Sequence, residues 1–284
     1  MNRIGAMATL ANFPTDAVSC FNALGTRLLD SPEAITLLEE GTAILMGGEH
    51  PKDCSAALSE LADCDPYTAD MAIALYAATP LREAYASRGL DDALFLGVLE
   101  DLRCKLMECR NVKGVWGTFV MHWYPGFYQM TRFVLGRLQY EYREMPVDMN
   151  GFTKGQQVLN CHIPSSGPLT DESVDDSLRR AYEFFGIKGT MAVICSSWML
   201  YPPHNEELFP EGSNLRRFYD RFTVISERIF DEPRDAWRVF GTMDLDLQKL
   251  PTDTALRRNL HRYLSAGKKM GSGLGVLFYN PVNG

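Results

Sequence analysis

The chain has 284 residues, of which 46% are hydrophobic and 23% charged, and its formal net charge is −8. These values are typical of a globular protein large enough for two domains and exclude a disordered chain. The acidic charge disfavours a nucleic-acid partner, which usually requires a basic surface. No apolar run approaches the roughly 20 residues that span a bilayer, so we expect no membrane partner. The short apolar part of the N-terminus favours a cytoplasmic protein over a secreted one.

The cysteines and histidines show no metal-binding spacing. The seven cysteines include no Cys-x-x-Cys pair, and the five histidines form no His-Glu-x-x-His or His-x-His motif. Scattered cysteines of odd number are typical of reduced thiols. The sequence therefore predicts neither a metal site nor a disulfide framework, and it favours a small molecule as the partner.

Residues 1 to about 130 are predicted to be helical. Apolar side chains recur at helical spacing from Val18 to Leu28, from Pro66 to Ala77 and from Leu94 to Leu106. Loops are expected at 46–51 and 87–90, where glycine interrupts the pattern. We find no catalytic constellation in this half, and we interpret its Met and Tyr stripes as core.

From about Gly136 the period changes from helical to alternating. Apolar and polar side chains alternate over 138–143, which predicts a strand with one polar face. Further strands are predicted at Val158–Ile163 and Met191–Leu200, and the second of these should be central because it is apolar on both faces at its start. An amphipathic helix over 174–185 lies between them. The two strands should therefore be close in one sheet, as in a β-α-β unit.

Shorter elements complete the second half. They are a helix at Ser213–Tyr219, strands at Phe222–Ile229 and around Trp237–Phe240, a helix over Leu256–Leu264, and, after a glycine-rich turn, a strand at Leu274–Tyr279. The change of period between residues 111 and 136 is the only sign of a domain boundary.

The strand Val158–Ile163 runs into a loop that can hold an anion. Ser165, Ser166 and Gly167 lie between two prolines, and the next helix offers backbone N–H groups at its positive end. We interpret this as a site for a thioester or nucleotide phosphate beside His162. The alternative is an ordinary strand-to-helix connection, because four acidic residues over 171–176 already place negative charge there.

Polar side chains that could act as a base share one side of two strands. Glu141 lies on the polar face of the first strand, while Asn160 and His162 share one side of the second. If these sides line one cleft, Glu141 or His162 can remove a proton from an attacking amine or hydroxyl. The alternative is that Glu141 pairs with Arg137 or Arg143 on a solvated face.

The central strand ends in further candidate groups. Cys195 could form an acyl-enzyme if a histidine activates its thiol, although its apolar surroundings favour a buried structural role. Ser196 or Ser197 could donate a hydrogen bond or a proton. The run 268–275 follows a helix and precedes a strand, so we interpret its glycines as a turn and its two lysines as secondary candidates for a phosphate contact.

Five segments carry a resemblance to a known family. They are Leu135–Glu141, Asn160–Pro164, Gly167–Leu169, Cys195–Leu200 and Ser213–Leu215. In this order and spacing they resemble bacterial acyltransferases with a helical N-terminal domain and a GNAT-like C-terminal domain. The resemblance implies an α+β protein, with a helical domain over 1–115 and a GNAT-like mixed-sheet domain over 116–284.

The resemblance also implies acyl-CoA or acetyl-CoA as a co-substrate, without a metal. In GNAT folds the thioester lies against the strand before the pyrophosphate loop, whose backbone N–H groups bind the phosphates. The matching positions here are Cys161, Ile163, Ser165, Ser166, Gly167 and Leu169. The family's usual loop motif, Arg or Gln followed by x-x-Gly-x-Gly/Ala, does not follow this strand.

The sequence thus predicts transfer of an acyl group from acyl-CoA to a small-molecule amine, by direct attack in a ternary complex. Glu141 or His162 deprotonates the amine, and Ser196 protonates the departing thiolate; an acyl-enzyme at Cys195 is a variant. The alternative is a non-catalytic protein that retains the fold and binds a metabolite or a protein partner.

Overall fold

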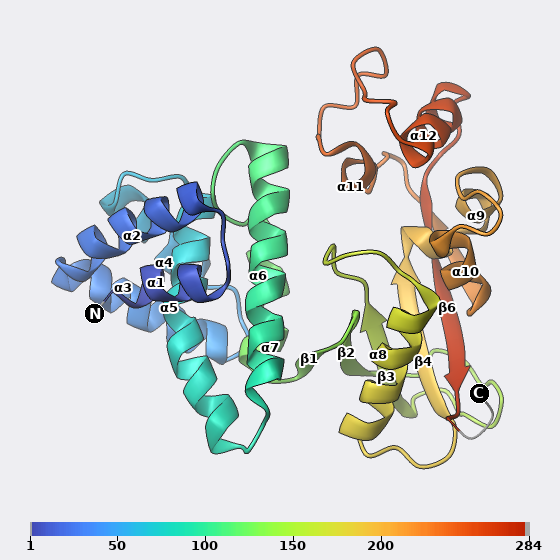
Figure 1. The fold of residues 1–284 in the computed structure, drawn as a ribbon, viewed down its shortest axis with the longest axis horizontal. Coiled ribbons are helices and arrows are strands. Elements are labelled where there is room, and N and C mark those ends of the chain that lie inside the picture. Colours follow the sequence, from blue (N-terminus) through green and yellow to red (C-terminus); the bar gives the residue numbers. More distant parts are fainter. Residues whose placement is uncertain (1, 282–284) are drawn as a thin grey trace. The chain divides into compact units, whose positions relative to one another are not determined.

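The computed structural model describes residues 2–281 and divides into two compact units, Met1–Val134 and Leu135–Gly284 (Figure 1). The boundary lies within the interval where the sequence pattern changes period, and later than the expected boundary at 115/116. It is later because short helical segments continue after the last long helix, up to Tyr128.

The first unit is a bundle of helices around one buried helix. Its elements are α1 (Arg3–Leu10), α2 (Thr15–Leu29), α3 (Pro32–Met46), α4 (Lys52–Leu61), α5 (Pro66–Ser87), α6 (Asp92–Lys113), the 3-10 helix η1 (Met121–Trp123) and α7 (Pro125–Tyr128). Every residue of α5 from Thr68 to Ala78 is buried, as expected for a helix that packs against neighbours on all sides. These neighbours are α1, α3, α4 and α6.

The second unit is built on a six-stranded mixed sheet. The strands of this sheet are β1 (Arg132–Leu135), which spans the boundary between the units, β2 (Leu138–Glu144), β3 (Gln157–His162), β4 (Met191–Ser197), β5 (Thr223–Ile229) and β6 (Gly271–Tyr279). Their order is β1-β2-β3-β4-β6-β5. β3 and β4 are parallel and joined through helix α8 (Asp171–Phe184), whereas β2–β3, β4–β6 and β5–β6 are antiparallel. The predicted α+β class, the β-α-β unit and the interior position of β4 are confirmed.

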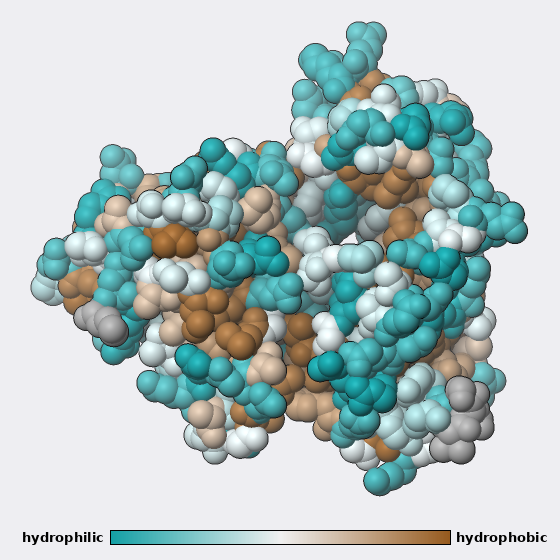
Figure 2. Space-filling model, viewed as in Figure 1, coloured by the Kyte–Doolittle hydropathy of each residue, from teal (hydrophilic) through white to brown (hydrophobic). Residues whose placement is uncertain are grey.

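The two faces of this sheet are covered differently. On one face, Ser177 of α8 binds the backbone of Leu135 and Leu138 and the hydroxyl of Tyr140. The opposite face carries an apolar cluster that includes Val158, Ile194 and Val276. The outward side of α8 is hydrophilic, as the teal surface in Figure 2 shows. α8 therefore closes one face, and the site must be sought on the other.

The remaining helices of this unit lie between β4 and β6 in the sequence. They are η2 (Trp198–Leu200), α9 (Pro202–Glu207), α10 (Asn214–Asp220), α11 (Trp237–Phe240) and α12 (Ala255–Ser265). The strand expected at Trp237–Phe240 is wrong, because these residues form α11, which ends at Gly241 with a φ of +74°. Four residues are too few for periodicity to separate the two structures.

Two further boundaries differ from the expectation. The third strand ends at Ser197 rather than Leu200, because the Ser197 hydroxyl accepts a hydrogen bond from the Met199 amide and starts a 3-10 turn. The last strand begins at Gly271 rather than Leu274, so the predicted glycine turn is wrong. Glycine is needed at Gly273 because a Cβ there would lie 1.9 Å from the Leu200 carbonyl oxygen.

A buried histidine makes the stability of this unit depend on pH. His204 of α9 is 0% exposed; its Nδ1 donates to the Trp198 carbonyl at 2.8 Å, and its ring packs edge-on against Tyr201 and Tyr263. Burial lowers the pKa of His204 below its usual value of 6.5. Since the unfolded chain then binds the proton more readily, this contribution to stability is complete above about pH 6.5 and is lost as pH falls below it.

We expect the melting temperature to decrease when the pH is lowered from about 6.5. Titration of His204 should change the free energy of unfolding by at most about 1.4 kcal/mol per pH unit. In His204→Asn, which retains a donor for the Trp198 carbonyl but does not titrate, the fall should be smaller. Thermal unfolding between pH 5 and 8 checks this. Equal pH dependence in both proteins would assign the effect to other groups.

Candidate active site

Pairing of β2 with β3 brings three polar side chains together on the face away from α8. Glu141 lies directly opposite Asn160, and His162 lies opposite Gln139 on the same side of the sheet. His162 Nε2 is 3.0 Å from Glu141 Oε1. Asn160 Nδ2 is 3.4 Å from the same oxygen and 2.9 Å from His162 Nε2. The carboxylate, amide and imidazole thus form one cluster.

Glu141 also pairs with Arg143, as the alternative interpretation expected, but it does so as a buried carboxylate rather than on a solvated face. Arg143 Nε and Nη2 lie 3.0 and 2.9 Å from Glu141 Oε1. The Glu141 side chain is only 7% exposed, whereas His162 is 21% and Arg143 60% exposed. Arg143 therefore supplies a positive charge from the solvent side, while His162 is accessible enough to meet a substrate.

The contact with Glu141 assigns the proton of the neutral imidazole. A carboxylate only accepts hydrogen bonds, so the tautomer that bonds to Glu141 Oε1 carries its proton on His162 Nε2. In this tautomer the 2.9 Å approach of Asn160 Nδ2 to His162 Nε2 is a contact between two donors and not a hydrogen bond. The lone pair of the neutral ring is then on Nδ1. This tautomer follows from the hydrogen-bond pattern, as histidine protonation generally must. His162 can therefore accept a proton at Nδ1 while Glu141 stabilises the resulting imidazolium.

The cluster lies where the pairing of β3 with β4 stops. Within residues 2–281, this pairing is described for Leu159 with Val193 and for Asn160 with Ile194. β4 continues to Ser197, still paired with β6. Ser196 follows two residues after Ile194, so it shares the sheet face of Asn160, and it is exposed. The carboxyl ends of both strands therefore present polar groups on this face.

Cys161 and Cys195 lie on the other face. Cys161 is paired with Tyr140, whose hydroxyl contacts α8, and both cysteines are buried. A hydrogen bond with Cys195, together with burial, raises the pKa of the Cys161 thiol. The structure does not bring Cys195 to His162, because the two side chains lie on opposite faces of the sheet. Cys161 adjoins the cluster through its backbone alone.

The loop after β3 has buried ends and an accessible middle. Pro164 and Leu169 are buried, Ser166 is half-buried, and Ser165 and Gly167 are exposed. Ile163 next to His162 is also half-buried. Thr170 caps α8, because its hydroxyl accepts a hydrogen bond from the Ser173 amide. The residues predicted to bind a cofactor thus form one continuous segment from β3 to the positive end of α8.

The acidic start of α8 is neutralised by arginines. Asp171 pairs with Arg217 at 2.7 Å and with Arg221 at 2.8 Å, and Arg221 also binds Asp175. The hydrogen bond from Arg221 lowers the pKa of Asp171. Sequence reasoning missed both arginines, although their i,i+4 spacing in and just after α10 places them on one helix face. Arg217 and Arg221 therefore compensate the charges of Asp171 and Asp175 beside the loop.

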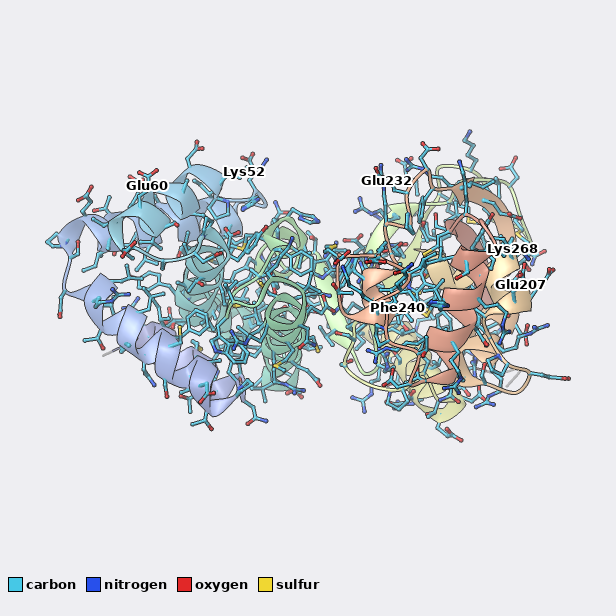
Figure 3. The ribbon with its side chains drawn as sticks, turned by 90° about the horizontal axis from the view of Figure 1, so that it is seen from above. Lys52, Glu60, Glu207, Glu232, Phe240 and Lys268 are labelled. Atoms are coloured by element: carbon cyan, nitrogen blue, oxygen red, sulfur yellow. The ribbon has the colours of Figure 1, made fainter. Side chains whose placement is uncertain are left out.

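The lysines considered as secondary phosphate contacts have acidic partners. Lys268 forms an ion pair with Glu207 of α9, and these two labelled side chains lie together in Figure 3. Lys269 lies 3.7 Å from Asp231. Both lysines follow α12 and precede β6, so they belong to the connection between these elements rather than to the loop after β3.

Residues 2–281 offer no metal-binding cluster and no helix that could span a membrane. No group of three or more His, Cys, Asp or Glu side chains there could hold a metal ion. No helix in the same range is long and apolar enough to cross a membrane.

Comparison with known proteins matches both units. Residues 133–277 match the GNAT-like C-terminal domain, and residues 3–130 match the N-acyltransferase N-terminal domain. No curated protein sequence matches the chain.

Solved structures with the same fold are acyltransferases. One, in complex with decanoyl-CoA and teicoplanin, has a TM-score of 0.77 and 22% identity, over 98% of this chain and 88% of that chain. Another, in complex with decanoyl-CoA, has a TM-score of 0.77 and 24% identity, over 96% and 86%. A third, in complex with CoA and 10C-teicoplanin, has a TM-score of 0.69 and 20% identity, over 96% and 98%. These structures share the two-part architecture along almost the whole chain.

Proposed function

Because the chain belongs to the family with the GNAT-like C-terminal domain, here preceded by an N-acyltransferase N-terminal domain, we propose that it transfers an acyl group from acyl-CoA to an amine of a small molecule. The membership confirms the resemblance read from the sequence. The observation that carries the proposal is the Glu141–His162 hydrogen bond, which places a supported base at the end of β3, next to the candidate phosphate loop.

Acyl-CoA is supported as the donor by this chain's own residues and by its structural relatives. The segment Ile163–Thr170 offers exposed backbone at Gly167 and leads to the positive end of α8, a favourable place for phosphates. Arg217 and Arg221 both pair with Asp171 in the first turn of α8. Relatives with this fold bind decanoyl-CoA or CoA. We propose that the phosphates contact this loop and that the thioester lies beside His162.

His162 is the base of the proposed reaction. The amine nitrogen attacks the thioester carbonyl carbon, and His162 Nδ1 takes the proton that the nitrogen loses as the C–N bond forms. Glu141 stabilises the imidazolium through Nε2, at 3.0 Å. Backbone N–H groups near His162 polarise the carbonyl oxygen while it carries negative charge.

Ser196 is proposed to complete the reaction at the departing sulfur. The C–S bond breaks as the carbonyl re-forms, and the thiolate takes a proton from the Ser196 hydroxyl. Ser196 regains a proton from solvent, and the His162 imidazolium releases to solvent the proton that it took from the amine. The products are an amide and free CoA. Ser196 is exposed on the sheet face that carries Asn160, so it is accessible from the side of the cluster. Cys195 plays no part in this scheme, because its side chain lies on the face covered by α8.

A change of Glu141 to Gln tests this function. The neutral amide of the variant cannot stabilise the imidazolium by charge, so we expect kcat to fall about 10- to 100-fold, the effect of losing a hydrogen bond between charged groups. The assay follows CoA release and amide formation by mass spectrometry, with decanoyl-CoA and the primary amine that the wild type acylates fastest. The matched control is Glu144→Gln, because Glu144 is an exposed carboxylate on the same strand. Equal rates for wild type and Glu141→Gln would contradict the proposed role of Glu141.

A further inference from the structure

An arginine outside the loop after β3 holds the middle of that loop. Arg137 lies in the turn between β1 and β2, directly after Gly136, whose φ is +73°. Its Nη2 donates to the Gly167 carbonyl at 2.6 Å, and its Nε donates to the Pro168 carbonyl at 3.1 Å. One planar guanidinium therefore fixes two successive carbonyl groups, 30 and 31 residues away in the sequence.

These bonds determine where the next amide points. No peptide bond in the described structure is cis, so the C=O and N–H of the peptide between Pro168 and Leu169 point in opposite directions. With the Pro168 carbonyl directed at Arg137, the Leu169 N–H is directed away from it. Pro168 itself has no N–H. Arg137 thus sets the direction of the Leu169 N–H, the first backbone N–H after the two carbonyls. Leu169 directly precedes Thr170, the N-cap of α8.

We propose that Arg137 is a positioning residue for acyl-CoA, which orients the backbone of Gly167–Leu169 so that the Leu169 N–H binds a phosphate. The inference rests on the proposed function, because it takes acyl-CoA as the ligand of this loop. Arg137 acts through the loop rather than by contact with the substrate. From the turn between β1 and β2, it compensates for the missing Arg or Gln of the usual loop motif.

The geometry requires an arginine, and this distinguishes positioning from attraction by charge. A lysine keeps the positive charge but cannot donate two parallel hydrogen bonds from one plane. We therefore expect Arg137→Lys and Arg137→Gln both to weaken binding of decanoyl-CoA about tenfold, as measured by calorimetry. The KM for decanoyl-CoA should rise by a similar factor, with kcat at saturation unchanged. Binding of S-decanoyl-pantetheine, which lacks the phosphates on which the loop acts, should not change.

The matched control is Arg258, whose Nη1 donates to the carbonyls of Thr252 and Asp253 in another loop of the same unit. Arg258→Lys should bind decanoyl-CoA like the wild type. Hydrogen exchange of peptides over 163–170 provides a readout without any ligand, and it should be faster in Arg137→Lys than in the wild type.

Three outcomes would overturn the inference. Wild-type affinity in Arg137→Lys, with loss only in Arg137→Gln, would mean that Arg137 acts by charge. Equal losses for decanoyl-CoA and S-decanoyl-pantetheine would mean a general effect on the unit rather than on the phosphate loop. No binding of decanoyl-CoA by the wild type would contradict the proposed function itself, and this inference with it, whatever hydrogen exchange shows for the loop.

Discussion

Changing His162 to Ala is expected to lower kcat/KM for acyl transfer by about 10²- to 10⁴-fold, the usual contribution of a general base. The variant loses the imidazole of the cluster and leaves Glu141, which is 7% exposed, without the ring that it orients. His162→Gln should be nearly as slow, since its amide can still donate to Glu141 but cannot accept the amine proton. Because binding does not depend on this proton transfer, the Kd for decanoyl-CoA should stay within about threefold of the wild type.

Initial rates of amide formation and calorimetry on the same preparations measure both quantities. The control is His261→Gln, which changes a half-buried histidine of the same unit whose Nε2 contacts the Leu247 carbonyl. We expect this control to retain wild-type activity. A fall of less than about fivefold in both His162 variants would show that another group removes the proton.

The second large effect is expected on stability, from Gly273→Ala in β6. The added Cβ would lie 1.9 Å from the Leu200 carbonyl oxygen and 2.5 Å from its carbon, both backbone atoms that cannot rotate away. β6 pairs with β4 at this point, through Ser197 and Gly273. Either the sheet or the turn after β4 must shift, and we expect the free energy of unfolding of this unit to fall by about 3 kcal/mol, the upper end for an overpacked core.

Chemical denaturation monitored by circular dichroism checks this expectation. Gly47→Ala is the control, because Gly47 ends α3 with a negative φ of −74° and a Cβ there would meet no atom closer than 3.2 Å. This change should be nearly neutral. If Gly273→Ala is as stable as Gly47→Ala, the close packing of the turn after β4 against β6 is not present in solution.

The sequence was sufficient to predict which side chains share the sheet face that carries the candidate site. Alternation over 138–143 placed Glu141 on the polar side of β2, and the same rule placed Asn160 and His162 together on β3. The register between the strands could not be predicted. A slip by two residues keeps every side chain on its face but moves Glu141 away from Asn160, so alternation alone does not distinguish the two alignments.

The features that the local sequence pattern could not predict depend on contacts between residues far apart in the sequence. The charges at the start of α8 argued against a phosphate, but Asp171 is paired with Arg221, 50 residues later. Gly271 and Gly273 suggested a turn, yet they lie in a strand that pairs with β5 and β4. Glycine is needed at these positions because the Tyr201 ring and the Leu200 backbone approach them closely. Similarly, Arg137 was considered only as a partner of Glu141, and the structure directs it to the carbonyls of Gly167 and Pro168.

The central claim, that this chain transfers an acyl group from acyl-CoA to an amine, is tested most directly by product analysis of the wild-type protein. Purified protein is incubated with decanoyl-CoA and a panel of primary amines that includes teicoplanin, and the mixture is followed over time by liquid chromatography with mass spectrometry. The account predicts a decanoyl amide of at least one amine, formed in equal amount with free CoA and at a rate that depends on the protein concentration. Absence of both the amide and protein-dependent CoA release, across the whole panel, would contradict it.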